Sequence, residues 1–288
     1  MHPRNRYQQP HDFSSLAGVV PELAGYLVIT PDGRTSLDFT SPQAVRLLNR
    51  ALLLRDYGLK HWDIPAGNLC PGVPGRLDYI HVLADLLGEG AQGGKKVRVL
   101  DVGTGASLIY PILGVGEYDW RFVGTDLDAG SLKVAGAIAR FNPAIGKSVL
   151  LRQQTEAGAI FRNVILPGET FACTMCNPPF FSDAASASAA ATQKWEKLGE
   201  SPEAQLNFGG QAHELWTPGG EPEFLRRMIR ESVAFKGQVG WFTTLVSKKG
   251  YLRNARQELD RMGAAWVREL PIGQGGKLRR VLAWTFRK

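Results

Sequence analysis

The sequence has 288 residues, of which 44% are hydrophobic and 21% are charged, enough apolar material for one large core or for a core with a small appendage. No apolar run approaches the roughly 18 residues that a membrane helix needs, and the first residues lack the apolar core of a signal peptide, so we predict a cytoplasmic protein without a membrane partner. The net charge of +7 favours a polyanionic partner such as nucleic acid.

Residues 1–90 are predicted to form an amino-terminal extension of loops and helices that packs on the main domain. Its clearest element is a helix at Ser41–Arg55, because Ser41 can cap it, Pro42 suits its first turn and Gly58 suits its exit. We also expect helices at Ser14–Val20 and Arg76–Leu87, and a turn at residues 31–33.

Residues 91–288 are predicted to form one α/β domain, in which strands and helices alternate. The expected strands are Val97–Asp101, Arg121–Asp126, Ser148–Arg152, Phe171–Cys176, Gln238–Val246, Ala265–Leu270 and Arg280–Phe286. The expected helices are Ala106–Leu113, Ser131–Phe141, Glu221–Phe235 and Tyr251–Met262. This alternation predicts a doubly wound parallel sheet of seven strands. The last two strands should be antiparallel neighbours, because no helix joins them.

A doubly wound, Rossmann-like sheet that ends in an antiparallel hairpin is typical of class I S-adenosylmethionine-dependent methyltransferases. A nicotinamide dehydrogenase does not usually end in this way. A polar insert at residues 181–220 interrupts the alternation after the fourth strand, and we expect it to contact the substrate.

The three cysteines, Cys70, Cys173 and Cys176, do not suggest a disulfide framework, because their number is odd and two of them lie only three residues apart. Cys173 and Cys176 stand in a predicted buried strand, where residues three apart face opposite sides of the sheet. A zinc site would also need further Cys or His ligands nearby. We therefore interpret both as small buried apolar residues and expect no bound metal.

The first motif with chemical meaning is the glycine turn Leu100–Ser107, between a strand and a helix. Gly103 and Gly105 let the backbone approach a ligand closely at the carboxyl edge of the sheet. A dinucleotide site needs a third glycine, and Leu108 stands in that place. Asp101 would repel a pyrophosphate, but it can help to hold the amino-acid end of S-adenosylmethionine, directly or through water.

The second element is Asp126, at the end of the second predicted strand. A carboxylate in this position can accept hydrogen bonds from both ribose hydroxyls of a cofactor. Asp128, two residues further on, is an alternative, but we interpret it as the cap of the following helix.

The third motif is Asn177-Pro178-Pro179-Phe180, directly after the fourth predicted strand. Consecutive prolines fix two φ angles, so the Pro178 carbonyl is held rigidly and can face the same point as the Asn177 side-chain oxygen. Two acceptors can then bind both hydrogens of one amino group, while Phe180 stacks on its ring. The nitrogen lone pair is thereby aimed at a methyl donor, and catalysis is mostly positioning.

This motif occurs in methyltransferases of DNA adenine, RNA adenine and protein glutamine, so it does not choose among the three. A DNA enzyme usually carries a recognition segment larger than the insert at 181–220. A glutamine enzyme would not need the basic amino-terminal segment that contains Arg4 and Arg6. An RNA-binding module without catalysis would not need Asn177, Pro178 and Asp126 together.

Nearly the whole chain resembles the ribosomal RNA large subunit methyltransferase F family, bacterial 23S rRNA adenine-N6 methyltransferases related to a eukaryotic RNA adenine-N6 enzyme. The motifs that carry the resemblance are His2–Arg6, Trp62–Pro65, Val73–Arg76, Asp78–His81, Gly103–Ala106, Ile109–Pro111, Cys176–Phe180, Leu206–Gly210, Gly219–Glu221 and Ala283–Phe286. The resemblance implies S-adenosylmethionine-dependent methylation of a flipped-out adenine, by a protein that we take to be a monomer.

The resemblance also implies roles for individual residues. Arg76 would bind the carboxylate of the cofactor's methionine, with Gly103 and Ser107 at the same end, and Asn177 would also adjoin the cofactor. Asp126 would bind the ribose, and Thr155 would lie near the adenine. The residues expected to contact RNA are Arg4, Asn5 and Arg6 of a basic arm, Phe181 and Asn207 of the insert, and Lys248, Lys249, Lys277 and Arg280.

Overall fold

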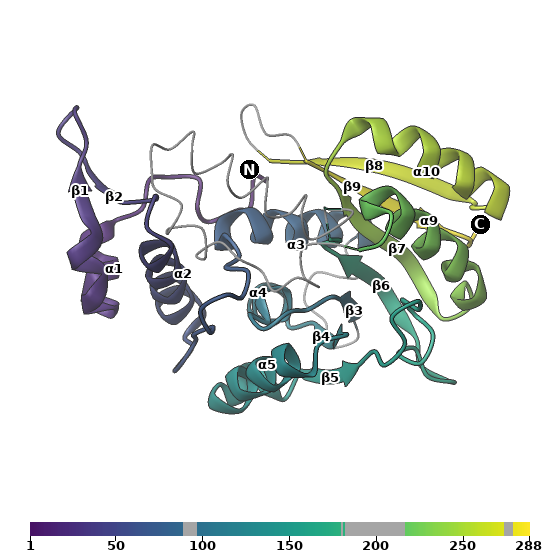
Figure 1. Cartoon of the computed structure of the whole chain (residues 1–288), viewed down its shortest axis with the longest axis horizontal. Helices are drawn as coiled ribbons and strands as arrows, with labels where there is room; N and C mark the ends of the chain where they lie inside the picture. The colour runs from purple at the N-terminus through teal and green to yellow at the C-terminus, as the bar shows by residue number, and fades with distance from the viewer. Residues whose placement is uncertain (89–96, 180, 182–216, 274–278) are drawn as a thin grey trace.

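The computed structural model describes residues 1–88, 97–179, 181, 217–273 and 279–288. Within these residues a seven-stranded sheet has the strand order β5-β4-β3-β6-β7-β9-β8 (Figure 1). The strands are β3 (Arg98–Val102), β4 (Arg121–Asp126), β5 (Val149–Gln153), β6 (Phe171–Cys176), β7 (Val239–Val246), β8 (Trp266–Ile272) and β9 (Arg279–Thr285). β3 to β7 pair in parallel, and β9 is antiparallel to both β7 and β8. The predicted sheet and its closing hairpin are confirmed.

Helices cover both faces of the sheet. They are α3 (Val73–Leu87), α4 (Ile109–Tyr118), α5 (Ala129–Phe141), the short α6 (Pro143–Gly146), α9 (Gly220–Ser232), the 3₁₀ turn η4 (Val233–Phe235) and α10 (Lys249–Met262). α3, α4 and α5 share one apolar cluster with Val99, whereas α9 and α10 share another with Leu100 and Trp284. Val99 and Leu100 belong to different clusters because neighbouring residues of a strand face opposite sides.

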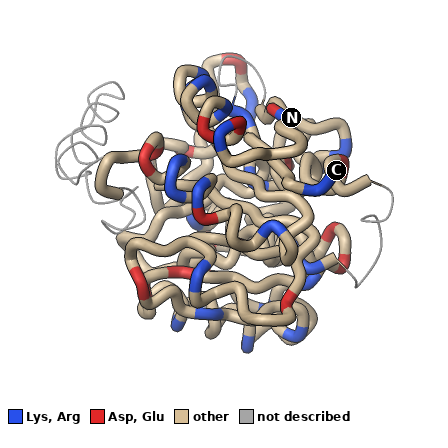
Figure 2. Tube along the Cα trace, turned by 90° about the vertical axis from the view of Figure 1, so that its right-hand side faces the viewer, with Lys and Arg blue, Asp and Glu red and all other residues tan. Residues whose placement is uncertain are grey.

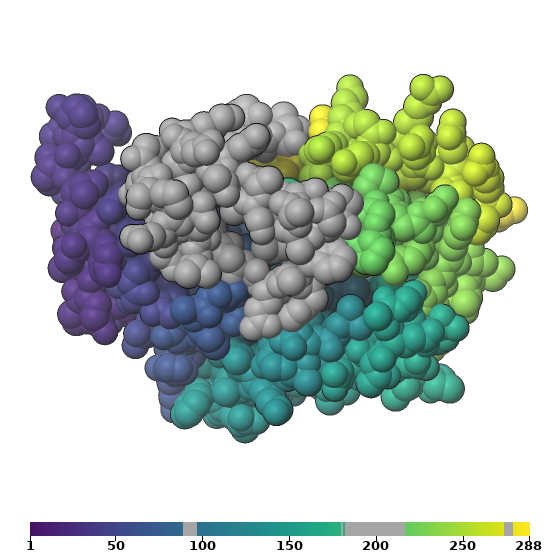
Figure 3. Space-filling view, in the orientation of Figure 1, coloured from purple at the N-terminus to yellow at the C-terminus, as the bar shows by residue number. Residues whose placement is uncertain are grey.

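The amino-terminal extension packs at one end of the molecule, opposite α9 and α10 (Figure 3). It contains α1 (Phe13–Val19), η1 (Pro21–Tyr26), β1 (Leu27–Ile29), β2 (Thr35–Leu37) and α2 (Pro42–Tyr57). Its apolar residues join the same cluster as α3 and α4. In the described part of the chain, no helix is both long and apolar enough to cross a membrane.

Several predicted boundaries shift for local physical reasons. α3 begins at Val73 because Pro74 is accommodated in its first turn. α4 begins at Ile109 because Leu108 adopts a left-handed conformation, with φ of 53°. α4 continues to Tyr118 through Gly114, where an added Cβ would meet the Phe122 ring at 2.3 Å. The β1–β2 hairpin was predicted only as a turn, because three-residue strands carry little periodic signal.

Candidate active site

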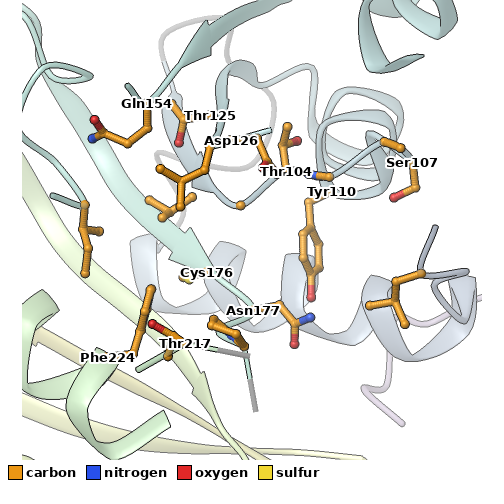
Figure 4. Close-up of a pocket in the computed structure, with 18 of the residues that line it drawn as sticks. Thr104, Ser107, Tyr110, Thr125, Asp126, Gln154, Cys176, Asn177, Thr217 and Phe224 are labelled. Carbon is orange, nitrogen blue, oxygen red and sulfur yellow. Dashed lines mark hydrogen bonds between the residues drawn. The ribbon is translucent and has the colours of Figure 1, made fainter. Parts of the chain in front are cut away.

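The carboxyl ends of β3, β4 and β6 meet at a cavity of about 320 Å³ (Figure 4). This is the edge of a parallel sheet at which ligands bind in open α/β folds. The cavity walls come from the loop and helix before the sheet (Leu69, Pro71, Arg76), the glycine turn (Val102–Ser107), the start of α4 (Ile109, Tyr110), the ends of β4 and β5 (Asp126, Leu127, Gln154), and Asn177 with Thr217, Phe224 and Arg227. The structure therefore brings the three predicted motifs to one place.

The glycine turn is held against β4 by main-chain hydrogen bonds. The N–H groups of Gly103 and Thr104 both donate to the Thr125 carbonyl, each over 2.9 Å. Gly103 and Gly105 have φ of +74° and +64°, a region that favours glycine. Ser107 lies at the far end of the turn, where its carbonyl accepts the Trp62 indole N–H over 2.9 Å. The conformation of the turn is thus fixed by the protein itself, before a ligand binds.

Asp126 lies in the cavity wall with its carboxylate already oriented. One oxygen accepts the Gly105 N–H over 2.9 Å, and the other accepts the Asp128 N–H over 3.0 Å. Each carboxylate oxygen has further lone pairs that can receive hydroxyl donors. The Asp128 side chain instead accepts the Ser131 N–H over 2.6 Å and caps α5, as predicted.

Asp101 is fully buried, and neither of its carboxylate oxygens has a hydrogen-bond partner among the described residues. It does not line the cavity but lies behind the glycine turn. Burial raises the pKa of Asp101 from its ordinary value of 3.8 to about 7. The negative charge of Asp126 adds to this rise, whereas the Thr104 side chain and the positive charge of Arg76 lower the pKa.

Asp101→Asn should therefore stabilise the free protein most at alkaline pH. Between pH 3.8 and 7 the unfolded chain releases a proton that the native state keeps, so wild-type stability falls as the pH rises through this window. The amide does not ionise, so we expect the variant to melt several degrees above the wild type at pH 8, with a smaller gain at pH 5. Thermal melts at both pH values test this, and an equal gain at both would contradict it.

Asn177 directly follows β6, and its side-chain oxygen is buried without a hydrogen-bond partner among the described residues. A hydrogen bond from α3 holds the end of β6 in place, because the Cys176 N–H donates to the Tyr79 hydroxyl over 3.4 Å. That hydroxyl also lies 2.7 Å from the Thr243 hydroxyl. Pro178 is buried and Pro179 lines the cavity. The stacking residue that the sequence predicts, Phe180, lies outside the described residues.

Of the other two residues predicted to bind the cofactor, Arg76 lines the cavity and Thr155 does not. Arg76 of α3 lines the cavity, with its guanidinium carbon 5.7 Å from the centre of the Tyr110 ring. Thr155 is exposed and does not line the cavity, whereas its neighbour Gln154 is buried and does. Sequence reasoning missed Gln154, and also Phe224, because neither carries a local chemical signal. Tyr110 also lines the cavity, and its place in the Ile109–Pro111 motif is the sequence signal that indicates it.

The predicted basic arm is docked on the body of the protein. Arg4 forms an ion pair with Asp85 over 2.6 Å, and Arg6 forms one with Glu117 over 2.7 Å. Asn5 is buried, and its amide donates to Asp78 over 2.6 Å, so its side chain anchors the arm. The guanidinium groups of Arg4 and Arg6 stay partly exposed.

The remaining predicted RNA contacts lie on the surface of the main domain or outside the described residues. Lys248 and Lys249 are exposed at the start of α10, and Arg280 is half-buried in β9. Phe181 is half-buried, and its carbonyl accepts the Thr217 N–H over 3.0 Å. Asn207 and Lys277 are not among the described residues. Basic and acidic residues are interspersed over the face that carries α9 and α10 (Figure 2).

Cys173 and Cys176 are buried with free thiols, which agrees with their interpretation as small apolar residues. Burial raises the pKa of Cys173 to about 12, so the thiol stays protonated at neutral pH. The described ranges contain no cluster of three His, Cys, Asp or Glu residues with the spacing of a metal site.

The fold and the cavity together define a Rossmann-like methyltransferase. The defining features are the strand order, the glycine turn with Asp126 at the neighbouring strand end, and the Asn-Pro-Pro turn in the same cavity. The chain belongs to the RNA methyltransferase family, whose model matches residues 1–288. The resemblance expected from the sequence is thereby confirmed.

Two curated relatives cover nearly the whole chain. It is 48% identical over 287 residues to the ribosomal RNA large subunit methyltransferase F of Klebsiella pneumoniae subsp. pneumoniae, across 99% of this chain and 94% of that protein. It is 46% identical over 294 residues to the protein of the same name from Pseudomonas putida, across 99% of this chain and 93% of that protein.

Solved structures of a human methyltransferase share the fold. The hMettl16 catalytic domain in complex with the MAT2A 3′UTR hairpin 1 is similar, with a TM-score of 0.86 and 34% identity, over 100% of this chain and 96% of that chain. The N-terminal domain of human METTL16 in complex with SAH has a TM-score of 0.80 and 31% identity, over 100% of this chain and 99% of that chain.

Proposed function

We propose that this RNA methyltransferase transfers a methyl group from S-adenosylmethionine to the exocyclic N6 nitrogen of a specific adenine in 23S rRNA. The observation that carries the proposal is the Asn177 side-chain oxygen, which is buried without a partner among the described residues, in the cavity that also contains Asp126. A buried acceptor without a donor is unfavourable unless a ligand supplies one. The amino group of a base supplies such donors.

S-adenosylmethionine is the cofactor, in keeping with membership of the family and with the SAH complex of the similar human domain. It supplies a methyl group on a positively charged sulfur. We propose that the oriented Asp126 carboxylate binds its ribose hydroxyls and that Arg76 binds its carboxylate. Gly103, Gly105 and Ser107 would offer backbone groups at the same end, with Asp101 acting from behind the turn. Gln154 is better placed than Thr155 to adjoin the adenine.

At the substrate end, we propose that the Asn177 oxygen and the Pro178 carbonyl accept both hydrogens of the target amine. These bonds favour a pyramidal nitrogen whose lone pair points at the methyl group. When the new nitrogen–carbon bond forms and the carbon–sulfur bond breaks, the surplus amine proton can leave to water. Pro179 would pack beside the base and Phe180 would stack on it. Positioning of this kind can account for several kcal/mol of the barrier.

The RNA must reach this cavity with one base turned out of its stack, which costs a few kcal/mol and less from a loop. We propose that cations of the arm and the main domain contact its phosphates. The proposed contacts are Arg4, Arg6, Lys248, Lys249, Lys277 and Arg280, with Asn5 holding the arm and Phe181 and Asn207 nearer the base. We further propose that the protein acts in the cytoplasm, as a monomer and without a metal.

The decisive experiment is mass spectrometry of 23S rRNA nucleosides from cells with and without the protein. We expect one N6-methyladenosine to disappear from 23S rRNA when the protein is absent and to return when the gene is restored. An unchanged N6-methyladenosine content, or loss of a different methylated nucleoside, would contradict the proposed specificity.

A further inference from the structure

Tyr110, near the start of α4, presents a buried hydroxyl to the cavity. The residue is 3% exposed, it lines the cavity wall, and its hydroxyl oxygen has no hydrogen-bond partner among the described residues. An unpaired buried hydroxyl is unfavourable, and none of the described residues compensates for it here. The ligand that fills the cavity is therefore expected to contact this oxygen.

The neighbouring Tyr79 differs from Tyr110, because its hydroxyl has partners inside the protein. The two rings pack edge to face, with centroids 5.6 Å apart. The Tyr79 hydroxyl is satisfied inside the protein by the Thr243 hydroxyl at 2.7 Å and by the Cys176 N–H at 3.4 Å. Tyr79 thus supports the end of β6, whereas the Tyr110 hydroxyl has no such partner among the described residues.

The Tyr110 side chain lies near both the proposed cofactor residue Arg76 and the proposed substrate residue Asn177. Beside its ring lies the Arg76 guanidinium, at 5.7 Å from the ring centre. From the start of α4 the side chain points toward Asn177 (Figure 4). Arg76 is the proposed site of the methionine carboxylate and Asn177 that of the target amine. A cofactor held in this way would place its sulfonium and methyl group between these two residues, in the part of the cavity that Tyr110 lines.

We propose that the Tyr110 hydroxyl oxygen accepts C–H hydrogen bonds from the methyl group and the adjoining methylene of the cofactor's sulfonium, and so distinguishes the charged donor from its neutral product. This inference rests on the proposed use of S-adenosylmethionine at this site. A positive sulfur polarises the C–H groups attached to it and makes them better donors, whereas the thioether of SAH does not. The contact therefore strengthens binding of the substrate form of the cofactor and leaves binding of the product nearly unchanged.

The chemistry of the side chain agrees with this role. Burial raises the pKa of Tyr110 to about 12, so the group is a neutral hydroxyl at neutral pH and offers oxygen lone pairs without a full charge. Tyr110→Phe keeps the ring, and therefore its contacts with Arg76 and Tyr79. Because the hydroxyl it removes has no partner among the described residues, we expect the variant to fold and to melt no lower than the wild type.

Calorimetry of S-adenosylmethionine and SAH binding tests the inference. We expect Tyr110→Phe to weaken binding of S-adenosylmethionine by about five- to tenfold and to change SAH binding less than about twofold. Tyr251→Phe, which removes a hydroxyl outside the cavity, is the matched control and should change neither. A ¹³C-labelled methyl group on the bound cofactor gives a second readout. Its proton resonance should move upfield in Tyr110→Phe, because a C–H group that loses an oxygen acceptor becomes less deshielded.

The outcomes separate this inference from the proposed function. Equal weakening of S-adenosylmethionine and SAH binding would place the hydroxyl at a part of the cofactor that both ligands share. Unchanged affinity for both ligands would show that the hydroxyl does not contact the cofactor. Both results would overturn the inference while leaving the methyltransferase proposal intact. A wild-type protein that binds neither ligand would instead contradict the cofactor site itself.

Discussion

Asn177→Ala should reduce methyl transfer to RNA at least about a thousandfold while changing the affinity for S-adenosylmethionine less than about threefold. The Asn177 oxygen is the buried acceptor proposed to orient the target amine, and alanine leaves nothing in its place. The loss should fall on kcat, since orientation matters most as the new bond forms. Single-turnover transfer of a labelled methyl group to 23S rRNA measures it.

Two controls make this result specific. Asn254→Ala changes an exposed asparagine on α10, outside the cavity, and should leave the rate unchanged. Calorimetry of the Asn177 variant with S-adenosylmethionine shows whether the part of the cavity that binds the cofactor is intact. Full activity in Asn177→Ala would remove the proposed role of this residue. A parallel loss of cofactor binding would indicate a collapsed cavity instead of a lost amine contact.

Asp126→Ala should weaken binding of S-adenosylmethionine by about a hundredfold. Two hydrogen bonds from ribose hydroxyls to an ionised carboxylate would be lost, each typically about 1.5 kcal/mol or more. The variant also loses the carboxylate that receives the Gly105 N–H, so the glycine turn is less firmly held. Calorimetric titration with S-adenosylmethionine measures the affinity.

Asp128→Ala is the matched control for this prediction, because Asp128 is the same residue type two positions away. Its carboxylate caps α5 and does not line the cavity. We expect Asp128→Ala to lower the free energy of unfolding by about 1 kcal/mol, the usual effect of a lost helix cap, and to leave cofactor affinity unchanged. Equal losses of affinity in the two variants would show that the effect of Asp126→Ala is structural.

Local sequence signals predicted much of the fold and part of the site. The bounds of β4 and β6 agree with prediction to the residue, because each is a short apolar run bounded by turn residues. The helix caps Ser41 and Asp128 both accept a hydrogen bond from an N–H three residues further on. Signals of this kind depend on neighbours in the chain, so they can be interpreted without the tertiary structure.

The position after β5 shows where local signals are insufficient. The resemblance implied Thr155 as a neighbour of the cofactor, but Gln154 lines the cavity and Thr155 is exposed. Consecutive side chains along an extended segment face opposite ways, so a shift of one residue exchanges the inner and outer positions. A run of polar residues in the sequence does not say which of them is turned inward.

The amino-terminal arm shows a second limit. The resemblance implied that Arg4, Asn5 and Arg6 contact RNA. The structure adds that Asn5 is buried against Asp78 and that Arg4 and Arg6 are paired with acidic groups. The partners of Arg4 and Asn5 lie more than 70 positions away in the chain. Pairing over such separations depends on how α3 and α4 pack, and no local pattern reports it.

The residue types of the glycine turn, the acidic strand end and the Asn-Pro-Pro turn were sufficient to predict the kind of chemistry, because each motif has the groups that its ligand requires. Their assembly into one cavity, which Tyr110 also lines, was decided by the order of the strands. β3 lies between β4 and β6, so Val102 and Cys176, the ends of β3 and β6, become neighbours at one edge of the sheet although they are 74 positions apart in the chain. Only the packed sheet sets these distances, since the chain between the motifs is long enough to allow many others.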